Sequence, residues 1–292
     1  MPFNPKNMLG NLPAPRIDSY LRTIGDDATA DRLFPPGGAG QNFSIKFGSE
    51  VWGHSGIALG FIPPTATGAQ TVIEDATIME PDAALRNVQL KIALDQFWVE
   101  RYPGHGRHKI LCEFLGKNQT NTVREDLRFA MKLEAGDKSA AGVNGAPIFL
   151  GIAAGKNGIA FEGRMIHIGS SSDDAMLAAL ESDPVKQGLS LLTIAQPALG
   201  PFVALAGGLV AGVLKSSKNK EIYNFKLGLD FAESQTSAKL RLGSYIVVQS
   251  DHGNFSWKDV AWDRSRQLVL DTRTNAPIAY NYLIFRIAAY DD

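Results

Sequence analysis

The sequence predicts a mainly β protein of the antiparallel β-sandwich type, either one large sandwich or two joined, with a helical insert near 172–216. Three observations lead to this class. Apolar and polar residues alternate with a period of two along most of the chain, in short segments separated by Gly, Pro and Asn. Only one block has the features of helices. Apolar residues make up 45% of the 292 residues and charged residues 20%, the balance of a folded globular protein.

The chain divides into three regions on this basis. Residues 1–40 are rich in proline and predict an extended arm, with one short helix near 18–33. Residues 41–170 predict a β-sandwich. Residues 171–292 predict the helical insert followed by further β-strands, which either pack as a second sandwich or complete the first.

Half-buried strands dominate the second region. The clearest is EDLRFAMKLEAG, in which Leu127, Phe129 and Met131 lie on one face and charged residues on the other. Asn157-Gly158 predicts a tight hairpin turn, because these residues accept the positive φ that such turns need. The other strands of this region are predicted at 42–49, 55–62, 71–79, 88–100, 107–116, 147–154 and 159–168.

The third region begins with a helix and returns to strands. Ser171 is placed to cap a helix through SDDAMLAALES, and Asp173 and Asp174 fall in its first turn, where the helix dipole favours negative charge. Alternation resumes in IYNFKLGLDFAE. Further strands are predicted at 240–249, 266–271 and 279–290.

An uncharged stretch at 188–214 lies between Lys186 and Lys215. Its length is that of a membrane span, but Pro197 and Pro201 break it in the middle, and the second half makes only about 20 Å of helix, too short for a core of about 30 Å. We therefore expect two short pieces covered by the sheets of the same protein. Insertion into a membrane and burial in a subunit interface stay open as alternatives.

Small residues in this stretch allow close packing. Gly208 and Gly212 form a G-x-x-x-G pair, which lets another backbone approach whether in lipid or in a protein core. Together with Phe202 they are the predicted contacts of an interface or a membrane.

Candidate metal ligands and nucleophiles are few. His54, His105 and His108 are the candidate ligands of a metal, yet zinc takes three or four ligands and Gly-rich loops hold them poorly, so we expect solvated or capping histidines. Cys112 alternates with Ile110 and Phe114, which predicts a buried thiol and not a nucleophile. No phosphate-binding or nucleophile-elbow motif is present.

We therefore expect no catalytic residues and no cofactor. The alternative is that the protein binds calcium, because acidic residues cluster near loop ends, at Asp173-Asp174, Asp251 and Asp259 with Asp263.

The functional prediction is a non-enzymatic protein that acts by protein binding or self-assembly. Its partner is either a second copy of itself, in a homo-oligomer, or another protein. The net charge of −1 argues against nucleic acid as a partner. One cysteine and no apolar signal core predict a cytoplasmic location. Two alternatives remain: a membrane-active effector that exposes 188–214, and a metal-dependent hydrolase that uses His54, His105 and His108.

Overall fold

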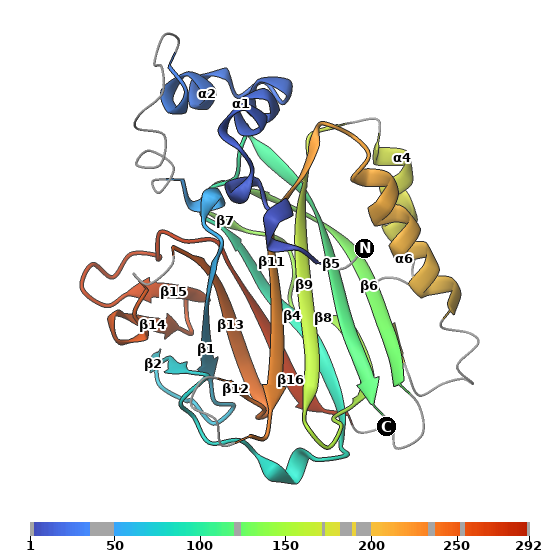
Figure 1. The fold of residues 1–292 in the computed structure, drawn as a ribbon. Helices are drawn as coiled ribbons and strands as arrows, with labels where there is room; N and C mark the ends of the chain where they lie inside the picture. The colour runs from blue at the N-terminus through green and yellow to red at the C-terminus, as the bar shows by residue number, and fades with distance from the viewer. Residues whose placement is uncertain are drawn as a thin grey trace.

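The computed structural model describes residues 3–35, 50–119, 124–170, 173–181, 189–190, 200–232, 237–251 and 255–290. It confirms a mainly β, antiparallel sandwich-like fold with a small helical part (Figure 1). The predicted strand at 42–49 lies outside the described residues. Ladders are antiparallel except for two pairs of short strands.

The larger sheet has eight strands, in the order β10-β8-β4-β16-β13-β1-β3, with β7 added to β4. The two strands from after the helical segment, β16 and β13, lie together in the middle of this sheet, where β16 pairs with β4 and β13 pairs with β1. The bounds are β1 Gly56–Ile62, β3 Glu74–Asp75, β4 Gln89–Val99, β7 Ser139–Ala140, β8 Ala146–Ala153, β10 Leu189–Ser190, β13 Gly243–Ser250 and β16 Tyr282–Ala289.

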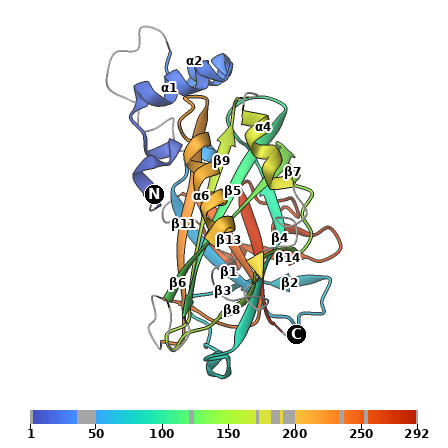
Figure 2. The same cartoon turned by 90° about the vertical axis from the view of Figure 1, so that its right-hand side faces the viewer.

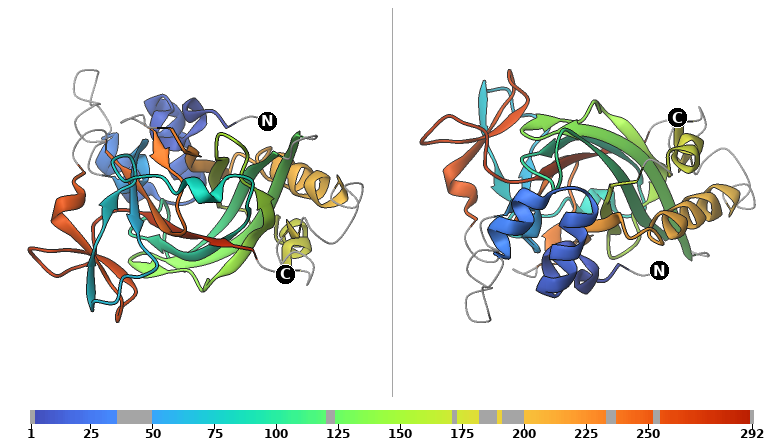
Figure 3. Two further views of the ribbon diagram at one scale, coloured as in Figure 1. Left: turned by 90° about the horizontal axis from the view of Figure 1, so that it is seen from below. Right: turned by 90° about the horizontal axis from the view of Figure 1, so that it is seen from above.

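The second sheet has five strands, in the order β12-β11-β9-β5-β6. Its bounds are β5 Arg107–Gln119, β6 Arg124–Gly136, β9 Ile159–Ile168, β11 Asn219–Asp230 and β12 Ala238–Lys239. A third sheet, in the order β15-β14-β2, consists of β2 Gln70–Val72, β14 Val260–Asp263 and β15 Leu268–Asp271. The three sheets form successive layers (Figure 3).

Aromatic side chains fill the space between the two large sheets. Phe161 of β9 is central, with its ring centroid 4.8 Å from that of Phe285 on β16 and 5.6 Å from that of Phe114 on β5. A smaller apolar cluster lies between the eight-stranded and three-stranded sheets, around Ile246, Val248 and Val269. Both faces of the eight-stranded sheet are thus covered, which explains the nearly continuous apolar sequence of β16.

Several predicted strands differ from the structure at chain reversals. The predicted strand 71–79 is divided between β2 and β3, and it ends at Asp75, whose side chain accepts from the backbone N–H of Thr77 and closes a turn. The strand predicted at 240–249 begins only at Gly243, whose φ of +147° few side chains adopt. The strand β14 was not predicted. The tight turn predicted at Asn157-Gly158 is present, with Gly158 at a φ of +105°, but the strands on either side of it, β8 and β9, belong to different sheets.

The N-terminal segment is helical where an extended arm was expected. It contains two short 3-10 helices, η1 Pro5–Asn7 and η2 Leu9–Asn11, and two α-helices, α1 Ala14–Thr23 and α2 Asp27–Leu33. The single helix predicted at 18–33 is divided because Gly25 takes a φ of +79° and the Asp26 side chain caps α2 at Thr29. These helices lie at one end of the sandwich (Figures 1 and 3).

The predicted helical insert contains α4 Asp174–Leu177, a 3-10 turn η6 Ala178–Glu181, the strand β10 and the helix α6 Gly200–Val213. Pro201 falls in the first turn of α6, where the backbone N–H that proline lacks would have no partner within the helix. Residues 191–199, with Pro197, lie outside the described residues. The remaining short elements are the 3-10 turns η3 Val51–Gly53, η4 Ala83–Leu85 and η8 Trp257–Asp259.

Candidate functional site

The helix α6 packs on the outer face of the five-stranded sheet, against β6 (Figure 2). Ala206, Leu209, Val210 and Val213 are buried there, while Ala204, Gly208 and Ala211 are exposed. The helix has no charged residue on either side. None of the helices in the described ranges is long and apolar enough to cross a membrane.

The predicted interface residues have different positions on α6. Gly208 is exposed, and a Cβ added to it would meet no atom within 4 Å. Gly212 is half-buried. Phe202 lies in the first turn, and its side chain is outside the described part. At the neighbouring Gly207 a Cβ would lie 2.8 Å from the Arg128 guanidinium, so this glycine permits the close approach of α6 to β6.

The three candidate metal ligands have separate surroundings. His105 is exposed, with 72% of its side chain accessible, and its Nε2 is 3.6 Å from Asp26. His108 is buried, and its Nε2 is 2.9 Å from Asp137. The ring of His54 lies 5.7 Å from that of Tyr280. Within the described ranges no three His, Cys, Asp or Glu side chains are grouped so that they would hold a metal ion.

The acidic residues considered for calcium bind protein groups. Asp174 accepts from Lys109 Nζ at 2.7 Å, and Asp173 accepts from Asn219. Asp263 accepts from the backbone of Ser265 and so closes a turn. Cys112 is buried as predicted, and burial raises the pKa of its thiol above the ordinary value.

A buried pair that sequence reasoning missed joins the N-terminal helices to the sandwich. The hydroxyl of Tyr20 on α1 lies 2.7 Å from Nδ1 of His167 on β9. Burial, with the nearby His108, lowers the pKa of His167 to about 3, so the imidazole is neutral; Nδ1 accepts a hydrogen bond from the Tyr20 hydroxyl in the tautomer that is protonated at Nε2. His167 shares its strand face with Phe161 and Met165, which was visible in the alternation of 159–168, but its partner on α1 was not.

A second buried polar group lies beneath the N-terminal segment on the outer face of the five-stranded sheet. Arg164 of β9 donates to Glu113 of β5 and, at 3.4 Å, to Glu221 of β11. The ring of Phe3 covers the guanidinium at 4.7 Å. Burial raises the pKa of Glu221, and its bonds to Asn224 and Arg164 oppose this. The group is enclosed, so we assign it a structural role.

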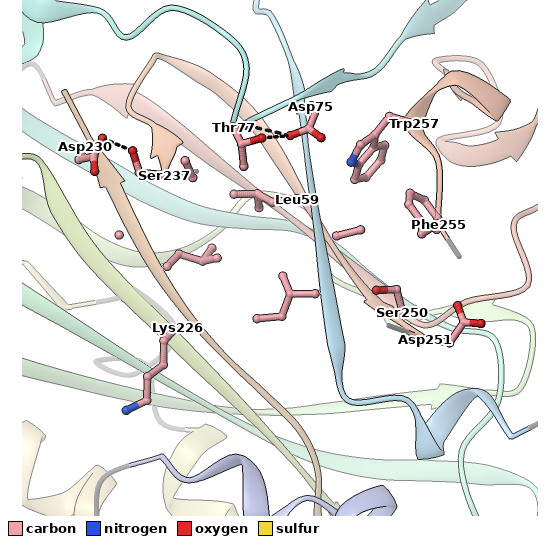
Figure 4. A pocket seen from close by; sticks show the side chains of 15 residues that line it. Leu59, Asp75, Thr77, Lys226, Asp230, Ser237, Ser250, Asp251, Phe255 and Trp257 are labelled. Atoms are coloured by element: carbon pink, nitrogen blue, oxygen red, sulfur yellow. Dashed lines mark hydrogen bonds between the residues drawn. The ribbon is translucent and has the colours of Figure 1, made fainter. Parts of the chain in front are cut away.

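An open groove lies between the edges of the two large sheets (Figure 4). Its volume is about 630 Å³. Residues Ile57, Ala58 and Leu59 of β1 form one wall, and Lys226, Leu227 and Gly228 of β11 form the opposite one. The other lining residues are Asp75, Thr77, Asp230, Ser237, Ala238, Ser250, Asp251, Phe255 and Trp257.

Two contacts between the sheets bound the groove. At one end the Tyr223 hydroxyl of β11 donates to the Gly56 carbonyl of β1 at 3.0 Å. At the other end the backbone N–H of Lys239 donates to the Ala76 carbonyl at 2.9 Å. Between these contacts, residues 57–58 of β1 and 225–228 of β11 pair with no strand of the described residues on the groove side.

The backbone direction of β11 follows from two bonds on its outer edge. The N–H of Asn224 donates to the Met8 sulfur at 3.3 Å, and the Asp230 carbonyl accepts from the N–H of Leu240 at 2.9 Å. In an antiparallel strand the main-chain groups of alternate residues point to the same side, so those of Lys226 face the groove. They have no hydrogen-bond partner among the described residues.

The same reasoning applies to β1. The Leu59 carbonyl accepts from Ala76 N–H on the side away from β13, so the main-chain groups of Ile57 also point away from β13 and into the groove. These too lack a partner in the described part of the chain. The groove therefore has unpaired main-chain donors and acceptors on both walls.

Comparison of the chain with protein-family models, with curated proteins and with solved structures finds no match. Among the groove residues only Asp251 was a candidate from the sequence. Ile57 and Lys226 are far apart along the chain, and the unpaired state of their main-chain groups has no signal in the sequence.

Proposed function

We propose that the protein acts by binding a partner protein in the groove between β1 and β11, and not by catalysis. The observation that carries the proposal is the pair of strand edges whose main-chain groups face the groove and have no partner among the residues that the structure describes. An unpaired strand edge recognises the main chain of an extended segment whatever its side chains, as in strand-addition complexes.

The side chains of the groove favour binding over catalysis. Of its carboxylates, Asp75 accepts from Thr77 and Asp230 accepts from Ser237, each through Oδ1, so both are engaged in turns. The lining residues include no histidine or cysteine. Cys112 is single and buried, which fits a cytoplasmic setting for such a protein.

The test uses two substitutions of one residue. Lys226→Pro removes the N–H that points into the groove, at an edge position where proline leaves the existing ladder bonds intact. Lys226→Ala removes the side chain and keeps the N–H. Peptides selected from a random library against the wild-type protein are expected to bind the alanine variant and to lose affinity for the proline variant. Selected peptides that bind both variants equally would overturn the proposal, provided circular dichroism shows both variants folded.

Self-association through α6 is a second candidate, because the outward face of this surface helix has no charged residue while surface helices ordinarily direct charges to water. The partner in this case is a second copy of the chain. Mass photometry is expected to detect oligomers of the wild-type protein that Gly208→Glu reduces to monomers, whereas Lys218→Glu, an exposed position beyond the helix, does not. A wild-type protein that stays monomeric at all concentrations excludes this candidate.

A further inference from the structure

We infer that the segment bound in the groove is an extended strand that pairs with β11 and alternates apolar with basic side chains. The inference rests on the proposed binding function and adds the chemistry of the partner.

The length of the open edge sets the length of the bound segment. Between the bond of Asn224 to Met8 and the β12 pairing, β11 is open from Phe225 to Gly228. At about 3.4 Å per residue this edge is roughly 14 Å long, which matches an extended segment of four or so residues. The open part of β1 is shorter, because the Leu59 carbonyl already accepts from Ala76. The longer edge therefore receives the main chain.

One face of the added strand meets apolar side chains. Leu227 and Leu59 point toward the interior between the sheets and are almost buried, and Ile57 beside them is 42% exposed. A strand added to β11 directs every second side chain toward these residues. Apolar side chains at those positions would cover Ile57, which is one of only three large apolar side chains found exposed among the described residues.

The remaining charge of the groove is acidic. Three carboxylates, from Asp75, Asp230 and Asp251, line it, against one ammonium group. That ammonium, of Lys226, lies 3.9 Å from Glu162 on the neighbouring strand, which offsets its charge. The alternate side chains of the bound strand therefore meet a negative potential and are complementary to it when basic.

Two aromatic rings add a further preference for a cation. Phe255 and Trp257 are half-buried, and their ring centroids are 4.8 Å apart in an edge-to-face arrangement. Figure 4 shows the Trp257 ring beside Asp75, with the Phe255 ring between Trp257 and Asp251. A lysine or arginine side chain next to these rings is attracted by a cation–π interaction with a ring face as well as by the charge of the carboxylate.

The experiment compares two synthetic peptides of about eight residues, one alternating Val with Lys and one alternating Val with Glu, each with blocked ends and a fluorescent label. Binding is measured by fluorescence anisotropy at low and at high salt. The Lys peptide is expected to bind at least about tenfold more tightly, equivalent to one favourable charge contact, and the difference is expected to shrink at high salt.

Protein variants locate the effect. Asp230→Asn combined with Asp251→Asn keeps the Oδ1 acceptors and removes two charges, so it should abolish the preference for the Lys peptide. Asp126→Asn, an exposed carboxylate on the same sheet outside the groove, is the matched control and should preserve it. Lys226→Pro should weaken both peptides, and Lys226→Ala should not.

The outcomes separate the two proposals. Equal affinity for both peptides, with both weakened by Lys226→Pro, overturns the inference about charge and leaves the binding function standing. Charge preference that survives the Asp230→Asn/Asp251→Asn change also overturns the inference. Binding of either peptide that Lys226→Pro does not weaken, or no binding of either one, counts against strand addition at β11 altogether.

Discussion

The buried His167 makes the stability of the protein depend on pH below about 6.5. Its imidazole is 5% exposed, accepts from Tyr20 and lies 5.4 Å from the ring of His108. Tyr102 and Asp137 are the other titratable groups nearby. In the folded protein its pKa is lowered to about 3, against an ordinary value of about 6.5. Acidification therefore protonates the unfolded chain first and favours unfolding.

The magnitude follows from the two pKa values. Stability from the neutral imidazole is complete above about pH 6.5 and is lost as the pH falls toward about 3. Each pH unit within this window costs about 1.4 kcal/mol, so acidification from about pH 6.5 to about pH 5 should lower the free energy of unfolding by roughly 2 kcal/mol.

Chemical denaturation at several pH values measures the effect. The wild-type protein is compared with His167→Gln, whose side-chain oxygen still accepts from Tyr20, and with His105→Gln as a control at an exposed histidine. The difference in unfolding free energy between wild type and His167→Gln is expected to narrow by roughly 2 kcal/mol between about pH 6.5 and about pH 5. His105→Gln should run parallel to the wild type. A constant difference for His167→Gln over this range would refute a neutral buried imidazole.

Four substitutions test other contacts by denaturant unfolding at neutral pH. Tyr20→Phe leaves the His167 acceptor buried without a donor and should cost about 1–3 kcal/mol; no loss would show that water reaches it. Arg164→Met leaves the buried Glu221 without an ion pair and Glu113 with Arg128 alone, and should cost about 3–5 kcal/mol, an expectation that a loss below about 1 kcal/mol contradicts. Gly163→Ala places a Cβ 2.3 Å from a phenylalanine ring of β11 and should lower the free energy of unfolding by about 1–3 kcal/mol. An unchanged denaturant concentration at the midpoint of unfolding would disprove the close contact. Gly208→Ala fills open space on an exposed helix position and should add about 0.5–1 kcal/mol, whereas a loss of stability would mean that this face is covered.

The local alternation of apolar and polar residues was sufficient to predict most strands, because successive side chains of a strand point to opposite faces of the sheet. The segment 159–168 became β9 with the predicted bounds, and 107–116 became β5 with a short extension. Alternation also placed Glu113 and Arg164 on the outer face of their sheet. It gave no indication that this face is covered by the N-terminal segment, since that contact joins residues far apart in the chain.

The uncharged stretch was interpreted correctly in one respect. No continuous span was expected, and the described helix begins at Gly200 and ends at Val213. What covers its outward face stays a prediction, because exposure of Gly208 depends on packing and not on local sequence.

The groove and the arm were beyond prediction for different reasons. The groove depends on which strands become neighbours, and sheet order is not encoded in the alternation of any one strand. The arm was predicted to be extended because prolines are frequent in it. Pro15, however, falls in the first turn of α1, where proline is tolerated.

The position of β16 in the eight-stranded sheet has a consequence for the order of assembly. During synthesis β1, β4 and β8 are made early and β13, the partner of β1, is made later, but the β8–β4 and β13–β1 halves of the sheet have no direct ladder between them. Residues 282–289 supply the strand that joins the halves, so the aromatic interior around Phe161 stays open until they appear. The sandwich is thus expected to close only after residue 289 has been made, and the edges of β4 and β13 stay exposed until then.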